Sequence, residues 1–258
     1  MNSFFEAQGL NYSLRSQSRS FFQPRPTQPI LQNINLHLAE RETLGIIGSS
    51  GSGKSTLARI LSGLLQPDNG HVSLRGEDFT NATSDVRQKL RPEIQMIFQD
   101  PQGALDPRQT VREIVGEPLL PLSLTQEERE QRIVNVLRDV ALPSNSLNRY
   151  PRAFSGGQRQ RIAIARALIT KPSVIIADEA VSALDVSTQA IILNLLLDLQ
   201  ERYGLSYIFV SHDLAVIRHI SHRTAVLDAG HIVETGPTAD IFSNPQHDTT
   251  RSLLAANF

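Results

Sequence analysis

The sequence has no cysteine, almost no net charge and no long hydrophobic run. Without cysteine, these residues form neither disulfides nor cysteine-bound zinc or iron–sulfur sites. The formal net charge of −1 gives no general attraction to nucleic acid, so no nucleic-acid partner is expected. The richest apolar stretch, residues 191–199, is interrupted by Asn194 and Asp198 and is shorter than the roughly 18 residues of a membrane span.

The chain also begins without the basic start and long apolar run of a signal peptide. We therefore expect a cytosolic protein, which other subunits would have to hold at any membrane where it acts. Its 258 residues, 40% of them hydrophobic, allow one large domain or two small ones with an ample core.

Hydrophobic periodicity predicts an α/β fold. Residues 4–14 and 29–38 are expected to be strands of a sheet with one wet face, because polar and apolar residues alternate along 33–38. The Ser-, Gln-, Arg- and Pro-rich residues 15–29 predict a loop. Further strands are expected at 44–47, 71–75, 94–98, 174–177 and 207–210, with a turn at 67–70 before the second of these and a hairpin over 225–234.

Residues 99–165 are expected to be mostly helical. Thr125 and Glu128 have the spacing of a capping box, and the helix that follows carries one apolar stripe, Ile133, Val136, Leu137 and Val140. A later helix is expected to begin at Asp185 and end near Gly204, with its own stripe of Ile192, Leu195, Leu196 and Leu199. The tail, 239–258, predicts short helices.

A phosphate-binding loop lies between a short apolar strand and a helix. It fits G-x-x-x-x-G-K-[ST] and consists of Gly48, Ser49, Ser50, Gly51, Ser52, Gly53, Lys54, Ser55 and Thr56. Glycines let the backbone curl around a polyanion, and the helix N-terminus adds partial positive charge. Lys54 is expected to reach the outer phosphates and Ser55 to coordinate Mg²⁺. A flexible Gly/Ser linker is the alternative, and the flanking strand and helix argue against it.

Two carboxylates follow the apolar strand 174–177. Asp178 is expected to bind Mg²⁺, directly or through water, and Glu179 to polarise the water that attacks the nucleotide. Alone, such residues would more often be solvent-facing; with the phosphate loop they predict an ATPase site.

Four further motifs resemble those of ATP-binding cassette (ABC) proteins, in that family's order. They are Gln99 as the Q-loop residue, the signature Ser155, Gly156, Gly157 and Gln158, the D-loop 182–185, and His212 as the switch histidine. The resemblance implies an α/β P-loop NTPase of the ABC type, a single domain over 1–258. It implies a RecA-like core with an antiparallel β subdomain (4–98 and 166–236), a helical subdomain (99–165) and a C-terminal tail (237–258).

The resemblance also implies how the motifs act. Two cassettes pair head to tail, and the signature of one closes on the ATP of the other, through Ser155 and Gly157. Gln99 joins the metal ligands and reports the nucleotide state to partners. His212 holds the γ-phosphate and the attacking water. Glu179 and His212 are then the catalytic residues, and Ser55, Gln99 and Asp178 hold the metal.

Two positions depart from the family pattern. Phe154 stands where the signature usually begins with leucine, and Leu14 aligns with the aromatic residue that stacks on adenine. Tyr12 is the expected substitute, with Phe21 and Phe22 as further candidates.

Several stretches are similar to ATPases of peptide/nickel-type importers, including 95–101, 105–108, 117–119 and 244–254. This implies two transmembrane permease subunits, a second ABC ATPase, identical or homologous, and indirectly a solute-binding protein. It places the chain peripherally on the cytoplasmic face of the bacterial inner (plasma) membrane. Peptide, nickel or a nickel chelate, and opine all remain open as the solute. The alternative is an ATPase of a soluble complex, such as a phosphonate carbon–phosphorus lyase system.

Overall fold

A computed structural model describes residues 4–15 and 27–256, and for Arg15, Pro101 and Gln102 the backbone alone. The predicted loop lies mostly outside these residues, as do Phe21 and Phe22. The chain forms two compact units. Unit 1 comprises Met1–Leu90 and Ile208–Phe258, and unit 2 comprises Arg91–Tyr207. The subdomain boundaries expected from the family stay a prediction. No helix in the described part is both long and apolar enough to cross a bilayer.

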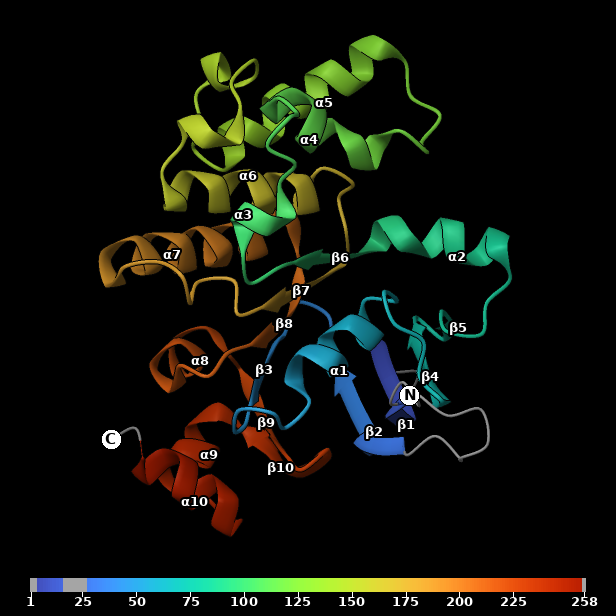
Figure 1. Cartoon of the computed structure of the whole chain (residues 1–258), viewed down its shortest axis with the longest axis vertical. Helices are drawn as coiled ribbons and strands as arrows, with labels where there is room; N and C mark the ends of the chain where they lie inside the picture. Colours follow the sequence, from blue (N-terminus) through green and yellow to red (C-terminus); the bar gives the residue numbers. More distant parts are fainter. Residues whose placement is uncertain (1–3, 16–26, 257–258) are drawn as a thin grey trace, which may run out of the picture. The chain divides into compact units, whose positions relative to one another are not determined.

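The elements of unit 1 are labelled in Figure 1. They are β1 (Phe5–Arg15), β2 (Thr27–Leu38), β3 (Thr43–Ile47), α1 (Lys54–Leu61), β4 (Asn69–Leu74), β5 (Glu77–Asp78), α2 (Ser84–Leu90), α8 (Leu214–Ile220), β9 (Arg223–Asp228), β10 (His231–Pro237), α9 (Thr238–Ser243) and α10 (Asp248–Ala255). The short helices predicted for the tail are thereby confirmed as α9 and α10. The chain passes from unit 2 into unit 1 within β8 (Ser206–Val210).

An antiparallel sheet of order β2-β1-β4-β5 forms one layer of unit 1. Its wet face is confirmed, since Ile34, Leu36 and Leu38 are buried while the polar residues between them are exposed. Two predicted boundaries were wrong. β2 begins at Thr27, inside the predicted loop, because it continues to pair with β1, and β4 begins at Asn69, inside the predicted turn, because Asn69 pairs with Asn11.

The other sheet of unit 1 is mixed. β3, buried at all five residues, pairs in parallel with β9, and β9 turns into antiparallel β10. This confirms the predicted strand and hairpin. Helix α8 packs on β3, where a Cβ at Gly45 would lie 2.6 Å from the Ser221 Oγ. The His222 Nδ1 accepts a hydrogen bond from the Thr43 N–H, so this histidine has a structural partner.

Unit 2 contains parallel strands with helices packed around them. Its elements are β6 (Ile94–Ile97), α3 (Pro101–Ala104), α4 (Val111–Gly116), α5 (Gln126–Asp139), α6 (Gly156–Leu168), β7 (Val174–Asp178) and α7 (Val186–Tyr203), with short 3-10 turns at Arg91–Glu93, Glu117–Leu119, Ser144–Ser146 and Pro151–Ala153. β6 pairs in parallel with β7, which is buried throughout.

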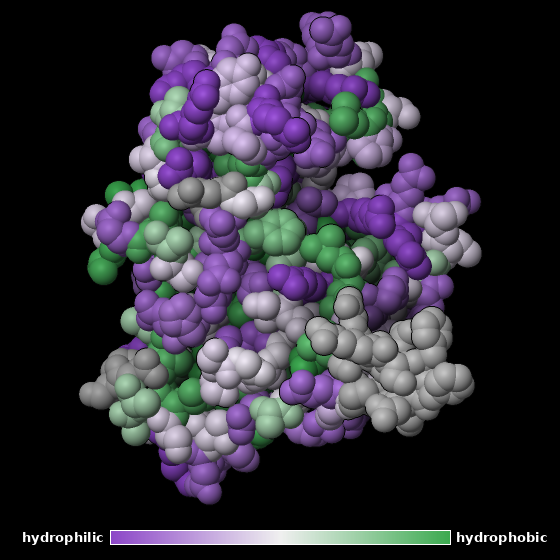
Figure 2. Space-filling model, in the orientation of Figure 1, coloured by the Kyte–Doolittle hydropathy of each residue, from purple (hydrophilic) through white to green (hydrophobic). Residues whose placement is uncertain are grey.

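The predicted helix limits in unit 2 are confirmed. Thr125 and Glu128 form the capping box of α5, and all four residues of its stripe are buried. Asp185 caps α7, which ends at Gly204 with a left-handed φ of 65°. In the α7 stripe, Leu195 is half-buried and the other three residues are buried. Figure 2 shows mostly hydrophilic residues over the part of the face where α4 and α5 lie, with a few hydrophobic residues among them.

Candidate functional site

The glycine-rich loop follows β3 and runs directly into α1. Gly53, the residue before the helix, has φ 108°, which side-chain-bearing residues rarely adopt. A Cβ at Gly53 would lie 2.9 Å from the Leu31 Cδ2 and 3.0 Å from the Ile30 carbonyl oxygen. Strand β2 therefore holds the turn so tightly that only glycine fits.

The β9–β10 hairpin fixes the other side of the loop. The Gly230 N–H donates to the Ser52 carbonyl at 3.2 Å, and the Gln32 N–H donates to the Gly230 carbonyl at 2.8 Å. A Cβ at Gly48 would lie only 2.1 Å from the Leu227 carbonyl oxygen. The shape of the loop is thus imposed by backbone on two sides.

This packing predicts unequal costs for two glycine replacements in the loop. Gly48→Ala forces a Cβ against fixed backbone, so we expect a loss of about 3 kcal/mol in the free energy of unfolding. Gly51→Ala is the control: no atom lies within 4 Å of its Cβ position, although its φ is 79°. Its free energy of unfolding should fall by only about 1 kcal/mol, the cost of placing a side chain at this φ. Equal losses in denaturant unfolding would contradict the packing argument.

Polar groups of the loop are arranged to receive an anion. The Lys54 Nζ is largely buried and donates to the Gly48 and Ser49 carbonyls, both at 2.8 Å. The Ser52 Oγ is buried and has no hydrogen-bond partner in the described structure. A buried cation and an unsatisfied hydroxyl within a curled backbone fit a phosphate chain.

In unit 2, Asp178 is the last residue of β7 and is buried, and Glu179 follows it with a left-handed φ of 47°. Such a conformation costs of order 1 kcal/mol and is common at functional sites. The Gln99 Nε2 donates to the Glu179 Oε2 at 2.7 Å. The sequence reasoning placed both residues in the site but missed this contact.

The strand register explains the Gln99–Glu179 contact. Ile97 of β6 pairs with Ala177 of β7, and Gln99 and Glu179 each lie two residues beyond that pair. Parallel strands end at the same edge of a sheet, so equal offsets bring the two side chains together. The contact also orients the amide: its nitrogen faces Glu179, which leaves its oxygen for the predicted metal.

The predicted metal ligands have suitable chemistry. Ser55 in unit 1 offers a hydroxyl, while Asp178 and Gln99 in unit 2 offer a carboxylate and an amide oxygen. Mg²⁺ prefers oxygen ligands of these kinds. Each of the three groups is therefore of a type that Mg²⁺ accepts as a ligand.

The signature residues form the start of α6. The Ser155 Oγ accepts from the Gln158 N–H at 3.4 Å, and the Gln158 Oε1 accepts from the Ser155 N–H at 3.0 Å. Gln158 thus uses its side chain as a cap, while the Ser155 hydroxyl proton can still be donated. Phe154, which departs from the family leucine, is buried, and the Arg149 guanidinium lies 4.5 Å from its ring centroid.

The predicted D-loop ends at Asp185, which receives three hydrogen bonds. Its carboxylate accepts from the Ser187 hydroxyl and from both the N–H and the hydroxyl of Thr188. These bonds, the Ser187 bond foremost, hold the pKa of Asp185 well below its usual range. Likewise, in the importer-like stretch 105–108, hydrogen bonds from the Arg108 side chain lower the pKa of Asp106 to about 2.

The remaining predicted residues lie in unit 1. His212 is exposed, two residues after β8, and the next residue, Asp213, caps α8. Tyr12 lies on β1 and is half-buried, whereas Leu14 is exposed. The contact of Tyr12 with adenine stays a prediction.

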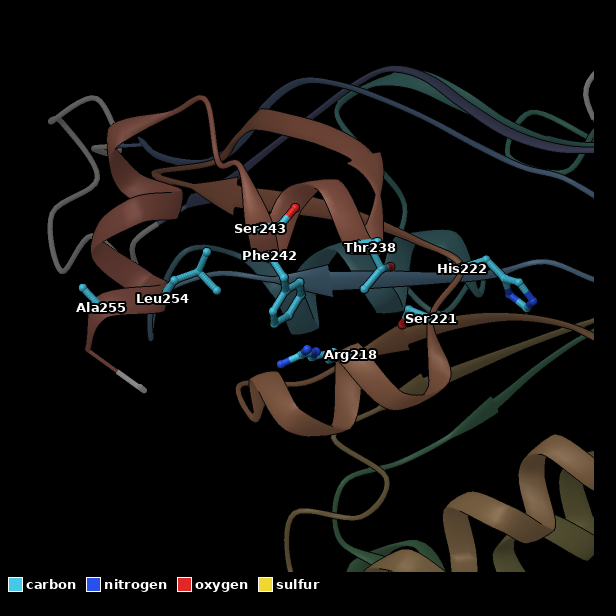
Figure 3. Close-up of a pocket in the computed structure, with 9 residues that line it drawn as sticks. Arg218, Ser221, His222, Thr238, Phe242, Ser243, Leu254 and Ala255 are labelled. Carbon is cyan, nitrogen blue, oxygen red and sulfur yellow. The ribbon is translucent and has the colours of Figure 1, made fainter.

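Unit 1 also has a cavity of about 850 Å³ beside the C-terminal helices (Figure 3). Phe242 of α9 projects toward Arg218 of α8 across it. The cavity is lined by Arg218, Ser221, His222, Thr238, Ala239, Phe242, Ser243, Leu254 and Ala255. None of these belongs to the predicted nucleotide site.

Comparison with known proteins identifies the family. The "ABC transporter" family model matches residues 31–182. The chain is 46% identical to the oligopeptide transport ATP-binding protein OppF of Escherichia coli K12, covering 96% of this chain and 75% of that protein. It is 43% identical to the di/tripeptide transport ATP-binding protein DppF of Pseudomonas aeruginosa, covering 93% and 74%.

Solved structures agree. The dimeric ATP-binding cassette MJ0796, bound to ADP and Pi, superimposes with a TM-score of 0.76 at 32% identity, covering 91% of this chain and 98% of that one. The cbiO1 protein of Clostridium perfringens, part of the ABC transporter complex cbiONQ, gives a TM-score of 0.80 at 25% identity, covering 95% and 92%. Since the family model covers more than half of the chain and OppF is 46% identical over 75% of its own length, this chain belongs to the ABC transporter family of ATP-binding proteins.

Proposed function

We propose that this chain is the ATP-hydrolysing subunit of an ABC importer that takes up peptides. The observation that carries the proposal is its identity of 43–49% with ATP-binding proteins named for peptide transport or import, over most of its length. Those names favour peptides over the nickel and opine alternatives, and transport over a soluble lyase complex. The left-handed φ of Glu179 and its hydrogen bond from Gln99 support the catalytic part of the proposal.

ATP, as substrate, would bind with its phosphates in the loop 48–56, where the Lys54 ammonium and backbone N–H groups neutralise their charge. Ser55, Asp178 and Gln99 would hold Mg²⁺. When bound, this ion would neutralise charge on the β- and γ-phosphate oxygens.

Glu179 would accept the proton of the attacking water. Its carboxylate accepts the hydrogen bond from Gln99, which holds it at the end of β7. Gln99 would therefore have a second role beyond metal binding, as the group that orients the base. His212 would hold the γ-phosphate and orient the water.

A second cassette, identical or homologous, would supply its signature head to tail. The Ser155 hydroxyl and the Gly157 N–H, at the start of the 13-residue helix α6, would donate to the ATP that the second cassette holds. The dimeric MJ0796 cassette supports pairing of this kind.

Membrane partners would dock on the segment from Gln99 to Leu120. On this segment Leu120 is a large hydrophobic residue with 65% of its surface exposed. The partners would be two permease subunits, which hold the chain peripherally at the cytoplasmic face of the inner membrane. A solute-binding protein would deliver the peptide to the permeases.

A pull-down tests the proposal. Tagged Glu179→Gln protein is purified from its own cells in gentle detergent with ATP, and its partners are identified by mass spectrometry. We expect two multi-span membrane proteins and a second cassette. Recovery of soluble enzyme subunits alone would overturn the importer and favour the lyase-type alternative.

A further inference from the structure

The second signature glycine packs against the helix that follows the D-loop. Helices α6 and α7 lie side by side in unit 2 (Figure 1). A Cβ at Gly157 would lie 2.4 Å from the Thr188 Cγ2, closer than real side chains approach. At Gly156 the corresponding Cβ would lie 3.5 Å from the Leu184 Cδ2, which is ordinary contact. Of the two signature glycines, therefore, only Gly157 must be glycine because of packing.

Thr188 is fixed in the rotamer that points its methyl at Gly157. Its Oγ1 donates to the Asp185 Oδ2 at 2.7 Å, and its N–H donates to the Asp185 Oδ1 at 3.0 Å. Threonine is stiff at χ1. Turning the methyl away from Gly157 would also carry the hydroxyl away from Asp185, so the clash cannot be relieved without losing that hydrogen bond.

We infer that Thr188 is a positioning residue that locks the signature turn, residues 155–158, to the D-loop carboxylate of Asp185. The linkage runs from that carboxylate through the Thr188 hydroxyl and methyl to the Cα of Gly157. Position 157 then requires glycine because of packing within its own chain, in addition to any contact with nucleotide. The inference rests on the proposed function to the extent that the signature acts in ATP hydrolysis.

A suppressor pair tests the contact, using the full chain. Gly157→Ala should lower ATP turnover at least about 10-fold and lower the melting temperature, because the new methyl meets Thr188. Thr188→Ser removes that methyl and keeps the hydroxyl. The double variant should regain the melting temperature of Thr188→Ser alone and its turnover to within about 3-fold.

Two results would overturn the inference: a double variant as impaired as Gly157→Ala, or Gly157→Ala with parental turnover and melting. Gly156→Ala is the matched control, since it meets Leu184. Thr188→Ser should leave any defect of Gly156→Ala unchanged, and rescue of both glycine variants would contradict a specific contact.

A second pair isolates the hydroxyl. Thr188→Val keeps the shape and loses the hydrogen bond to Asp185, whereas Thr188→Ser keeps the bond. Thr188→Val should lower kcat about 5-fold or more with unchanged affinity for a fluorescent ATP analogue, because the phosphate loop is untouched, and Thr188→Ser should retain kcat. Parental kcat in Thr188→Val would overturn the positioning role. Failure of the proposed function is separate: the parental chain would then show no ATP turnover, and the melting temperatures would still decide the contact.

Discussion

Glu179→Gln protein should bind ATP with parental affinity and hydrolyse it at least about 100-fold more slowly, the usual contribution of a general base. The substitution removes the group that takes the proton from water. It leaves an amide oxygen that can still accept the hydrogen bond from Gln99, so the local structure should persist. ATP turnover and binding of a fluorescent ATP analogue, measured on the same preparation, separate the two effects.

The hydrolysis defect should also trap the closed state. With ATP present, Glu179→Gln protein should accumulate as a dimer in light scattering, because reopening depends on hydrolysis. Glu201→Gln, an exposed carboxylate on α7, is the matched control and should behave as the parental chain. Parental turnover in Glu179→Gln would show that another group is the base.

Lys54→Met should bind ATP about 10- to 100-fold more weakly, the expected loss of one or two hydrogen bonds to a charged group. Methionine keeps much of the length and apolar character of the side chain but removes the ammonium. In the parental chain this ammonium donates to two loop carbonyls and is largely buried, so it is already placed inside the loop. Equilibrium binding of the fluorescent ATP analogue measures the change.

The matched control is Lys89→Met, because Lys89 is an exposed lysine of the same unit, paired on the surface with Glu77. Exposed ion pairs of this kind contribute little to the free energy of unfolding, so Lys89→Met should fold like the parental chain. Its ATP binding should therefore not change. Equal affinity in Lys54→Met and Lys89→Met would contradict the assignment of Lys54 to the phosphates.

The fold and most of the site could be predicted because they depend on local chemistry. Short residue patterns predict the buried strands. They also predict the helix N-caps at Thr125 and Asp185 and the end of α7 at Gly204. The start of β2 was misjudged because Thr27 and Gln28 look like loop residues and become strand only by pairing with β1.

Two contacts of the site depend on tertiary packing. The bond from Gln99 to Glu179 could have been found from the strand register, had β6 and β7 been known to be neighbours. The approach of Thr188 to Gly157 could not, because it depends on how α6 packs on α7 and on one threonine rotamer. Spacing along the chain carries no information on either.

The most direct test of the central claim is uptake of a radiolabelled tripeptide by cells in which this chain, Glu179→Gln or Glu201→Gln is the sole copy. The parental chain and Glu201→Gln should support uptake, and Glu179→Gln should reduce it to the level of cells that lack the chain. Parental uptake in the Glu179→Gln cells would contradict the claim that ATP hydrolysis by this chain drives peptide import.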